Sequence, residues 1–237
     1  MKRRKGITVK DAGRVQKRRA ALVRAAIKVF SGKGFNSSTV NEVARVAGVS
    51  QGTVYNYVDN KADLLYLVCS HVYGVYERHI EQALLGATDA LEKLYLALDA
   101  TIDATFELQD HLLLLYQEVH CLDRKQRKPF LRDAARLRAL YENILADAAA
   151  ATGLDFGHRR VVASMVLMLP SALIMRRWDL RGRVAESTMR NEAVRFLLKG
   201  LGLPSDRLRF GVDRRGASAT SGSRRRGVSG RARERVS

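Results

Sequence analysis

The stretch TVNEVARVAGVSQGTVYNYV, residues 39–58, decides the fold. Thr39 and Glu42 at its start form a capping box, in which each side chain accepts a hydrogen bond from the other residue's backbone N–H. Gly48 ends the helix that follows, because glycine readily adopts the left-handed conformation that a sharp turn requires. Ser50 then caps a second helix. The stretch therefore predicts two short helices joined by a tight turn, which is a helix-turn-helix.

Apolar residues recur at helical spacing along most of the chain, from Leu22 to Leu201, and no alternating strand pattern interrupts them. We therefore predict an all-α protein. After Gly86 the pattern changes from short, tightly turned helices to long ones, which indicates two domains. The expected organisation is a basic disordered arm (1–14), a three-helix domain that contains the helix-turn-helix (15–62), a helical domain (63–203) and a disordered tail rich in Arg, Gly and Ser (204–237).

The chain is strongly basic, since 42 Lys and Arg residues against 24 Asp and Glu give a formal net charge of +18 and a pI near 10.5. Such a charge favours polyanionic partners, either nucleic acid or an anionic membrane surface. Residues 1–19 and 213–237 together hold +14 of this charge. The tail has too few large apolar residues to fold, and we expect it to add salt-dependent, non-specific affinity for DNA. A solubilising extension without further function is the alternative.

The sequence argues against a membrane protein. Its first residues lack the apolar stretch of a signal peptide. Residues 161–175 carry no charge, but as a helix they would extend about 22 Å, short of the ~30 Å hydrocarbon core of a bilayer. We predict that this helix is buried in protein. Two cysteines, Cys69 and Cys121, give no disulfide framework, which points to a reducing, cytoplasmic location.

The second helix of the helix-turn-helix has the composition of a DNA-reading helix. Val54 and Val58 face inward, and the opposite face is polar. The major groove of DNA admits one α-helix, from which Asn and Gln pair with adenine and Thr contacts the thymine methyl group. A turn between packed helices that never contacts DNA is the alternative. The expected contacts with bases are Gln51, Thr53, Asn56 and Tyr57, with Gly52 on the same face, and those with phosphate are Arg18, Arg19, Thr39, Tyr55 and Lys61.

Residues 21–65 resemble the N-terminal domain of the tetracycline-repressor (TetR) family of bacterial transcriptional regulators. The resemblance rests above all on the Ala-Gly-Val-Ser turn at 47–50 and on the Gly-Thr-Val-Tyr that follows at 52–55. It covers about a quarter of the chain. Val58 stands where the family usually has Phe, and Asp59 where it commonly has Pro, so base preference or the entry into the next helix could differ.

The resemblance implies a homodimer that binds a palindromic operator, usually as a repressor in the bacterial cytoplasm, associated with the nucleoid when bound to DNA. The C-terminal domain then holds a small-molecule effector, whose binding moves the fourth helix and releases the DNA. The last two long helices, 159–177 and 186–201, are expected to form the dimer interface, since an apolar helix needs a cover. A short likeness in LLLLYQEVHCLD, residues 112–123, points to a hydrophobic or acyl-CoA-like effector.

Large side chains on the helices of the C-terminal domain are candidates for the effector pocket, because the resemblance implies that these helices enclose it. Ordinary core packing, with hydroxyl groups satisfied by neighbours, is the alternative. The cluster RKQRK at 124–128, expected in a loop, could receive an acidic headgroup or simply be solvated. The pocket candidates are Tyr66, Tyr73, Phe106, Tyr116, Gln117, His120, Met165 and Met168.

No catalytic or metal site is expected. His120 and Cys121 are neighbours, and on an α-helix neighbouring side chains point about 100° apart, so the two should not converge on one atom. No second His or Cys stands at ligand spacing, and no cofactor is predicted. A helical enzyme built around this pair has no triad or phosphate loop to support it. The remaining alternative is a basic helical protein that binds nucleic acid without sequence preference through its charged ends.

Overall fold

The computed structural model describes residues 9–204, with side chains from residue 13 onward. These residues form helices and turns and no strand, which confirms the all-α prediction. Most of the expected tail and the beginning of the expected arm lie outside the described residues. The helices are α1 (Val9–Lys33), α2 (Val40–Ala47), α3 (Gln51–Tyr55), α4 (Lys61–Ala83), α5 (Ala90–Glu107), α6 (Gln109–Glu118), the 3-10 turn η1 (Val119–Cys121), α7 (Arg124–Thr152), α8 (Arg159–Met175), α9 (Arg177–Leu180) and α10 (Glu186–Gly200).

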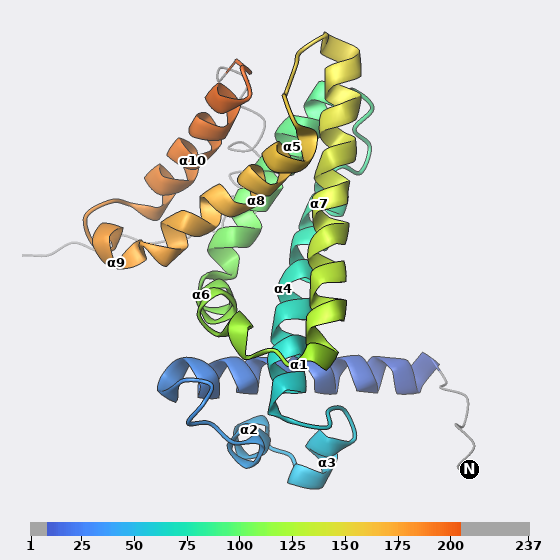
Figure 1. Ribbon diagram of the computed structural model, residues 1–237, viewed down its shortest axis with the longest axis vertical. Coiled ribbons are helices and arrows are strands. Elements are labelled where there is room, and N and C mark those ends of the chain that lie inside the picture. The colour runs from blue at the N-terminus through green and yellow to red at the C-terminus, as the bar shows by residue number, and fades with distance from the viewer. Residues whose placement is uncertain (1–8, 205–237) are drawn as a thin grey trace, which may run out of the picture.

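Helices α1, α2 and α3 form an N-terminal unit, in which α1 lies across the end of the longer helices (Figure 1). Apolar residues at helical spacing build its core, and Val43 and Val54 are fully buried there. The capping box predicted at Thr39 and Glu42 is formed. Gly48 follows α2 with a φ of 69°, in the left-handed region that the turn requires. The predicted helix-turn-helix is therefore confirmed as a local structure.

The remaining helices, α4 to α10, form the helical body. The long helices α4 and α7 run side by side, and α5 packs against both (Figure 1). Helix α8 packs against α5, α6 and α7, and α10 packs against α5 and α8. One stripe of each helix faces its neighbours, so side chains three and four apart fill the core. The largest fully buried side chains of the body include Leu64, Leu65, Ile80, Leu94, Leu98, Ile102, Tyr141 and Leu145.

Three boundaries differ from those that the sequence predicts. Helix α1 begins at Val9, inside the expected disordered arm, since residues 9–14 contain no proline to stop it. Helix α3 ends at Tyr55 and a turn at 56–57 follows, so that Val58, although buried, lies beyond the helix. The basic cluster 124–128 forms the first turns of α7 rather than a loop, because Lys, Arg and Gln are good helix formers.

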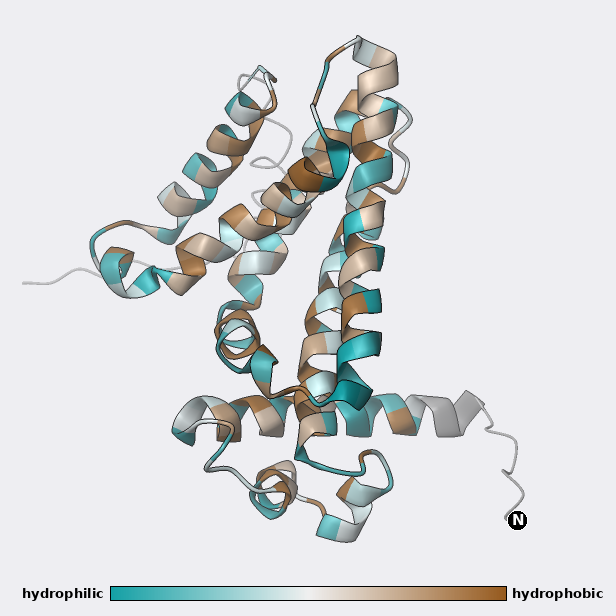
Figure 2. Cartoon of the chain, in the orientation of Figure 1, coloured by the Kyte–Doolittle hydropathy of each residue, from teal (hydrophilic) through white to brown (hydrophobic). Residues whose placement is uncertain are grey.

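Helix α8 contains the uncharged run for which the sequence predicts burial, but only one of its faces is buried. Ala163 and Val166 pack against the body, whereas Val161 and Met165 are 49% and 61% exposed. Figure 2 shows that hydrophobic residues follow each other along this helix. Within residues 9–204, no helix is long and apolar enough to cross a membrane. In this part of the chain nothing covers the outer face of α8.

Candidate DNA-reading surface and effector pocket

A short network of caps positions the second helix of the helix-turn-helix, α3. Ser50 Oγ accepts a hydrogen bond from the backbone N–H of Thr53 at 3.2 Å, so the helix begins at a defined residue. Val54 is fully buried and holds α3 against the core of the N-terminal unit. Four of the residues predicted on the DNA-facing side are exposed, namely Gln51, Gly52, Tyr55 and Asn56.

Three other residues of the predicted DNA surface are more constrained. Thr53 is half-buried, and its hydroxyl lies 2.8 Å from that of Ser50. Tyr57 is half-buried and packs against the core, so only part of its ring reaches the surface. Thr39 is exposed, but its hydroxyl donates to Glu42 Oε2 at 2.9 Å. On α1, the exposed cations predicted to contact phosphate are Arg18 and Arg19.

The side chain of Lys61 is placed differently from the predicted phosphate contact. Its ammonium group donates to the backbone carbonyls of Phe35, Asn36 and Ser38 at 2.7, 3.0 and 3.0 Å. It also lies 4.5 Å from the centre of the Phe35 ring. An ammonium group has three hydrogens, and all three are used inside the N-terminal unit. The prediction for Lys61 is corrected accordingly, because this side chain closes the α1–α2 connection.

Polar contacts join the N-terminal unit to the first turn of α7. Lys125 Nζ lies 2.5 Å from Asp59 Oδ2, and Gln126 Nε2 donates to Asp63 Oδ1 at 2.6 Å. Burial opposes ionisation of Asp63, but hydrogen bonds from Gln126 and from the Asp59 backbone N–H lower its pKa. The segment between α3 and α4 is therefore held to the body by charged groups.

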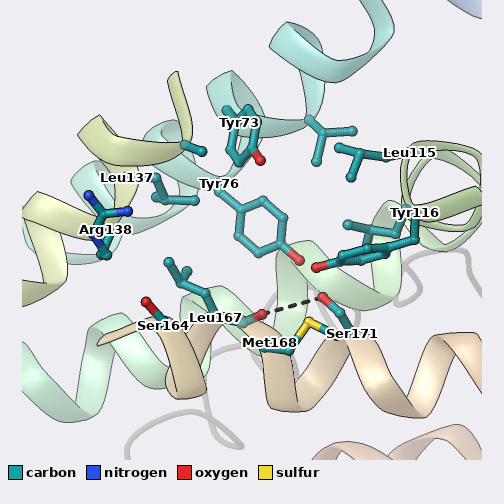
Figure 3. Close-up of a pocket in the computed structure, with 13 residues that line it drawn as sticks. Tyr73, Tyr76, Leu115, Tyr116, Leu137, Arg138, Ser164, Leu167, Met168 and Ser171 are labelled. Atoms are coloured by element: carbon teal, nitrogen blue, oxygen red, sulfur yellow. Dashed lines mark hydrogen bonds between the residues drawn. The ribbon is translucent and has the colours of Figure 1, made fainter. Parts of the chain in front are cut away.

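A cavity of about 350 Å³ lies between α4, α6, α7 and α8 and opens on the surface of the helical body beside the exposed side chains of Ser164 and Met168 (Figure 3). This volume is at the lower end of the range for small-molecule sites. Leucine, valine, alanine and methionine side chains form most of its wall. The polar residues that line it are Tyr73, Tyr76, Tyr116, Arg138, Ser164 and Ser171.

Three hydroxyl groups of this cavity, those of Tyr76, Tyr116 and Ser171, lie at one end, whereas Ser164 lies on the side of Arg138 (Figure 3). Figure 3 shows the hydroxyls of Tyr76 and Tyr116 close together, whereas Arg138 lies on the other side of the cavity. The Tyr76 hydroxyl is 2.7 Å from Thr105 Oγ1, and burial raises the pKa of Tyr76 to about 12. Arg138 is paired with Glu142 at 3.1 Å. The cavity can thus take an apolar ligand, with neutral hydroxyls at one end and a guanidinium at the other.

Three of the eight predicted pocket residues, Tyr73, Tyr116 and Met168, line this cavity. Two others face the interior elsewhere. The Tyr66 hydroxyl donates to Asp133 at 3.1 Å, and Phe106 is buried in the core beneath the guanidinium of Arg190. For these two residues the alternative of core packing is the one that the structure supports.

The remaining three candidates are also outside the cavity. Gln117 and His120 are exposed at the end of α6 and in η1, and Met165 lines a different hollow between α8 and α10. Tyr76 also lines the cavity, and the sequence points to it, because it stands three residues after Tyr73 and so shares its helix face. Arg138 was missed, since nothing in the local sequence marks it.

The hollow between α8 and α10 has a volume of about 580 Å³ and opens on the surface. Met165 and Phe196 line it and are 61% and 64% exposed. Large apolar side chains gathered on a surface mark an interaction site. The two helices are those for which the sequence predicts a dimer interface.

The expectation that His120 and Cys121 diverge is wrong. They belong to η1 rather than to an α-helix, and Cys121 Sγ lies 3.3 Å from His120 Nε2. Glu118 Oε2 lies 3.6 Å from the same sulfur. The physical reason is the winding of the 3-10 turn, in which residues three apart eclipse each other and bring Glu118 beside Cys121.

A capped helix-turn-helix on a helical body with a cavity is typical of one class of proteins, the helix-turn-helix regulators. Residues 22–67 match the sequence model of the family described as "Bacterial regulatory proteins, tetR family". The chain is 33% identical over 125 residues to the HTH-type transcriptional regulator HbdR of Aromatoleum sp. (strain CIB), a match that covers 53% of this chain and 54% of HbdR. The chain thus matches about half the length of that curated relative.

Solved structures have the same fold at low sequence identity. A tetR-family regulatory protein from Rhodococcus RHA1 superposes with a TM-score of 0.68 at 19% identity, covering 79% of this chain and 98% of that one. The transcriptional regulator FadR from Bacillus subtilis, in complex with stearoyl-CoA, gives 0.64 at 20% identity, covering 76% and 98%. Residues 22–67 thus match the N-terminal domain of the tetR family of bacterial regulatory proteins, and the curated relatives that the chain is similar to are named as transcriptional regulators.

Proposed function

We propose that the protein is a sequence-specific transcriptional repressor of the bacterial cytoplasm. It binds a palindromic operator as a homodimer, and an amphipathic effector in the cavity of the helical body releases it. The observation that carries this proposal is the course of α4, which supplies Tyr73 and Tyr76 to the cavity and begins at Lys61, directly after the helix-turn-helix. A displacement at the cavity therefore moves the DNA-reading surface.

The DNA-reading part of the proposal rests on α3 and its exposed side chains. Gln51 and Asn56 carry amide groups that pair with adenine in the major groove, and Tyr55 offers a hydroxyl to phosphate. The exposed cations Arg18 and Arg19 on α1 supply sequence-independent affinity. The base contacts would provide the preference for one DNA sequence, and the phosphate contacts would provide affinity for any DNA sequence.

The homodimer part rests on the α8–α10 hollow. Two copies of this surface would cover Met165 and Phe196 on each chain, and a two-fold arrangement would place two helix-turn-helix units on the two halves of a palindrome. A monomer would leave this apolar surface in water.

The effector part rests on the chemistry of the cavity. An apolar wall with hydroxyls at one end and Arg138 at the other suits an amphipathic molecule with an acyl chain and an anionic group. The B. subtilis FadR structure contains stearoyl-CoA, which supports an acyl-CoA as the first class to test. Such a ligand releases DNA only if it binds the displaced arrangement of α4 better than the DNA-bound one.

Footprinting on the DNA upstream of the protein's own gene and on genomic fragments tests the proposal, at about 150 mM salt with excess unrelated DNA. The expected result is a short, two-fold symmetric protected site. Members of an acyl-CoA series should abolish the protection of this site. Thr53→Ala combined with Asn56→Ala should abolish the preference for this site and leave the weaker, salt-sensitive binding nearly intact. Asn36→Ala, an exposed amide of the same unit outside α3, is the matched control.

Uniform coating of every fragment would overturn the proposal in favour of non-specific binding by the charged ends. Equal loss of both kinds of binding in the double variant would overturn the assignment of α3. A symmetric footprint that no acyl-CoA clears would leave the operator in place and remove acyl-CoA as the effector class.

A further inference from the structure

The turn between α6 and α7 carries a cluster that the proposed function does not use. Glu118, His120 and Cys121 each point one ligand atom into a common space, and these atoms lie within 4.8 Å of one another. Within the described part of the chain, this is the one group of three such side chains found so close together. We propose that the three residues form a binding site for a thiophilic divalent cation of the Zn²⁺ class.

The distances from the sulfur to the other two ligand atoms agree with tetrahedral coordination. Zinc binds sulfur at about 2.3 Å and nitrogen or oxygen at about 2.0–2.2 Å, so two ligand atoms of a tetrahedral site lie about 3.4–3.6 Å apart. Cys121 Sγ is 3.3 Å from His120 Nε2 and 3.6 Å from Glu118 Oε2. A shift of a few tenths of an ångström at most would bring the sulfur into position with respect to both partners.

The chemistry of the three groups selects the cation. A thiolate and an imidazole are the ligands that zinc prefers, and a carboxylate is common as a third. Magnesium and calcium require oxygen ligands and would not use the sulfur. With three protein ligands, the fourth position stays open for water or another small ligand, as in exchangeable rather than purely structural sites.

The carboxylate is held as a metal ligand needs to be held. Glu118 Oε1 accepts a hydrogen bond from the backbone N–H of Phe35 at 3.2 Å, while Oε2 faces Cys121. A hydrogen bond to the oxygen that does not bind metal orients a ligating carboxylate. Phe35 belongs to the α1–α2 connection, so the site lies where the N-terminal unit meets the body. Occupation of the site would fix this joint independently of the effector cavity.

Titration of the tag-free full-length protein with Co²⁺ tests the site, because cobalt bound to a thiolate has a charge-transfer absorption in the near ultraviolet. The expected result is one equivalent per chain with this band, displaced by one equivalent of Zn²⁺. Cys121→Ser should remove the band, and His120→Ala should weaken binding at least about tenfold. Glu118→Gln should weaken it similarly while it keeps an oxygen that accepts from Phe35 N–H.

Cys69 provides the matched control, since the chain has only two cysteines and this one is fully buried on α4. Cys69→Ala should leave the band and the affinity unchanged. Cobalt binding without the band, or a band that survives Cys121→Ser, would overturn the proposal.

A second measurement needs no variant. Zn²⁺ should slow the reaction of Cys121 with iodoacetamide, followed by mass spectrometry of the peptide that contains it, while Mg²⁺ should have no effect. An unchanged rate at saturating Zn²⁺ would contradict the site. Both readouts are independent of DNA and effector, so their failure would not bear on the proposed repressor function.

Discussion

The N-terminal unit and the helical body are organised by polar contacts of different range. The caps that shape the unit join residues three apart, as in Thr39 with Glu42. The buried and half-buried hydroxyls of the body reach much further, since the Tyr76–Thr105 contact spans 29 residues and the Tyr95 hydroxyl donates to the Pro204 carbonyl 109 residues away. A local segment can therefore specify the DNA-reading surface, whereas the cavity exists only after distant helices have packed.

The two regions also differ in what they leave open. The N-terminal unit exposes polar side chains that suit a polyanion, and most of its apolar residues are covered, although Val15 and Val46 are 37% and 41% exposed. The body leaves a cavity between α4, α6, α7 and α8 and an apolar hollow between α8 and α10. Under the proposed function the first region contacts DNA and the second region dimerises and binds the effector, and variants in each region test this division.

The largest effect is expected in the body, far from DNA. Phe196→Glu places a charge in the α8–α10 hollow, where a second copy would have to bury it, and burial of an unpaired carboxylate is costly. We expect the dimer to dissociate and the operator affinity to fall by at least about a hundredfold, because the two helix-turn-helix units no longer act together. Sedimentation and operator titration measure the two losses.

Leu85→Glu is the control for this variant, because Leu85 is 81% exposed and lies after α4, outside the hollow. It should change neither the mass nor the affinity. Phe196 is 64% exposed in the single chain, so its replacement should leave the secondary structure intact. A Phe196→Glu protein that remains dimeric would place the interface elsewhere and weaken the division between the two regions.

A smaller effect is expected where the two regions meet, at Lys61. Lys61→Met keeps the aliphatic stem and removes the ammonium group that donates to three carbonyls of the α1–α2 connection. Loss of these charged hydrogen bonds should cost about 2 kcal/mol of stability, measured by urea unfolding. The salt dependence of DNA binding should not change, because the ammonium is not expected to contact phosphate.

Arg18→Ala provides the opposite pattern, since Arg18 is exposed on α1. It should leave stability unchanged and reduce the slope of log affinity against log salt by about one. If Lys61→Met instead reduced the slope and left stability unchanged, the internal role of Lys61 would be refuted and the phosphate contact restored.

The sequence predicts the structure correctly where the deciding contacts join residues close together in the chain, and it fails where they join distant residues. The caps at Thr39 and Ser50 were predictable, because each partner stands three residues away in the sequence. Lys61 was misplaced because its carbonyl partners, 23 to 26 residues away, carry no side-chain signal in the sequence. Even in the N-terminal unit, prediction therefore failed as soon as the deciding contact was non-local.

In the body, the apolar pattern located the helices but not the walls of the cavity. A tyrosine on α4 can face α5, α7 or the cavity, and only the packing angle decides, which is why Tyr66 contacts Asp133 while Tyr73 lines the cavity. The prediction that His120 and Cys121 diverge was wrong for a related reason, since it assumed α-helical geometry for residues that form a 3-10 turn. Helix periodicity alone contains neither the packing angle nor this change of winding.

The smallest expected effect concerns the N-terminal unit, where the pH dependence of stability tests the contribution of one charged cap residue, Glu42. Glu42 accepts hydrogen bonds from Lys33, at 2.5 Å, and from the hydroxyl and backbone N–H of Thr39, and these contacts lower its pKa from 4.5 to about 2. A carboxyl group with a lowered folded-state pKa stabilises the fold fully above its unfolded value and loses that contribution as pH falls toward the folded one. Its stabilisation should thus be complete at neutral pH and decline between about 4.5 and 2.

Glu42→Gln isolates this charge, because glutamine can still complete the capping box at Thr39. We expect a small decrease in melting temperature at neutral pH, small because the carboxylate is exposed and screened by solvent. The difference between the two proteins should shrink as pH falls below 4.5, since protonation then removes the same charge from Glu42 in the wild-type protein. A difference that stayed constant over this range would mean that the geometry of the box, rather than the ion pair with Lys33, stabilises the start of α2. The DNA-reading surface would then be shaped by backbone caps alone, without help from charge.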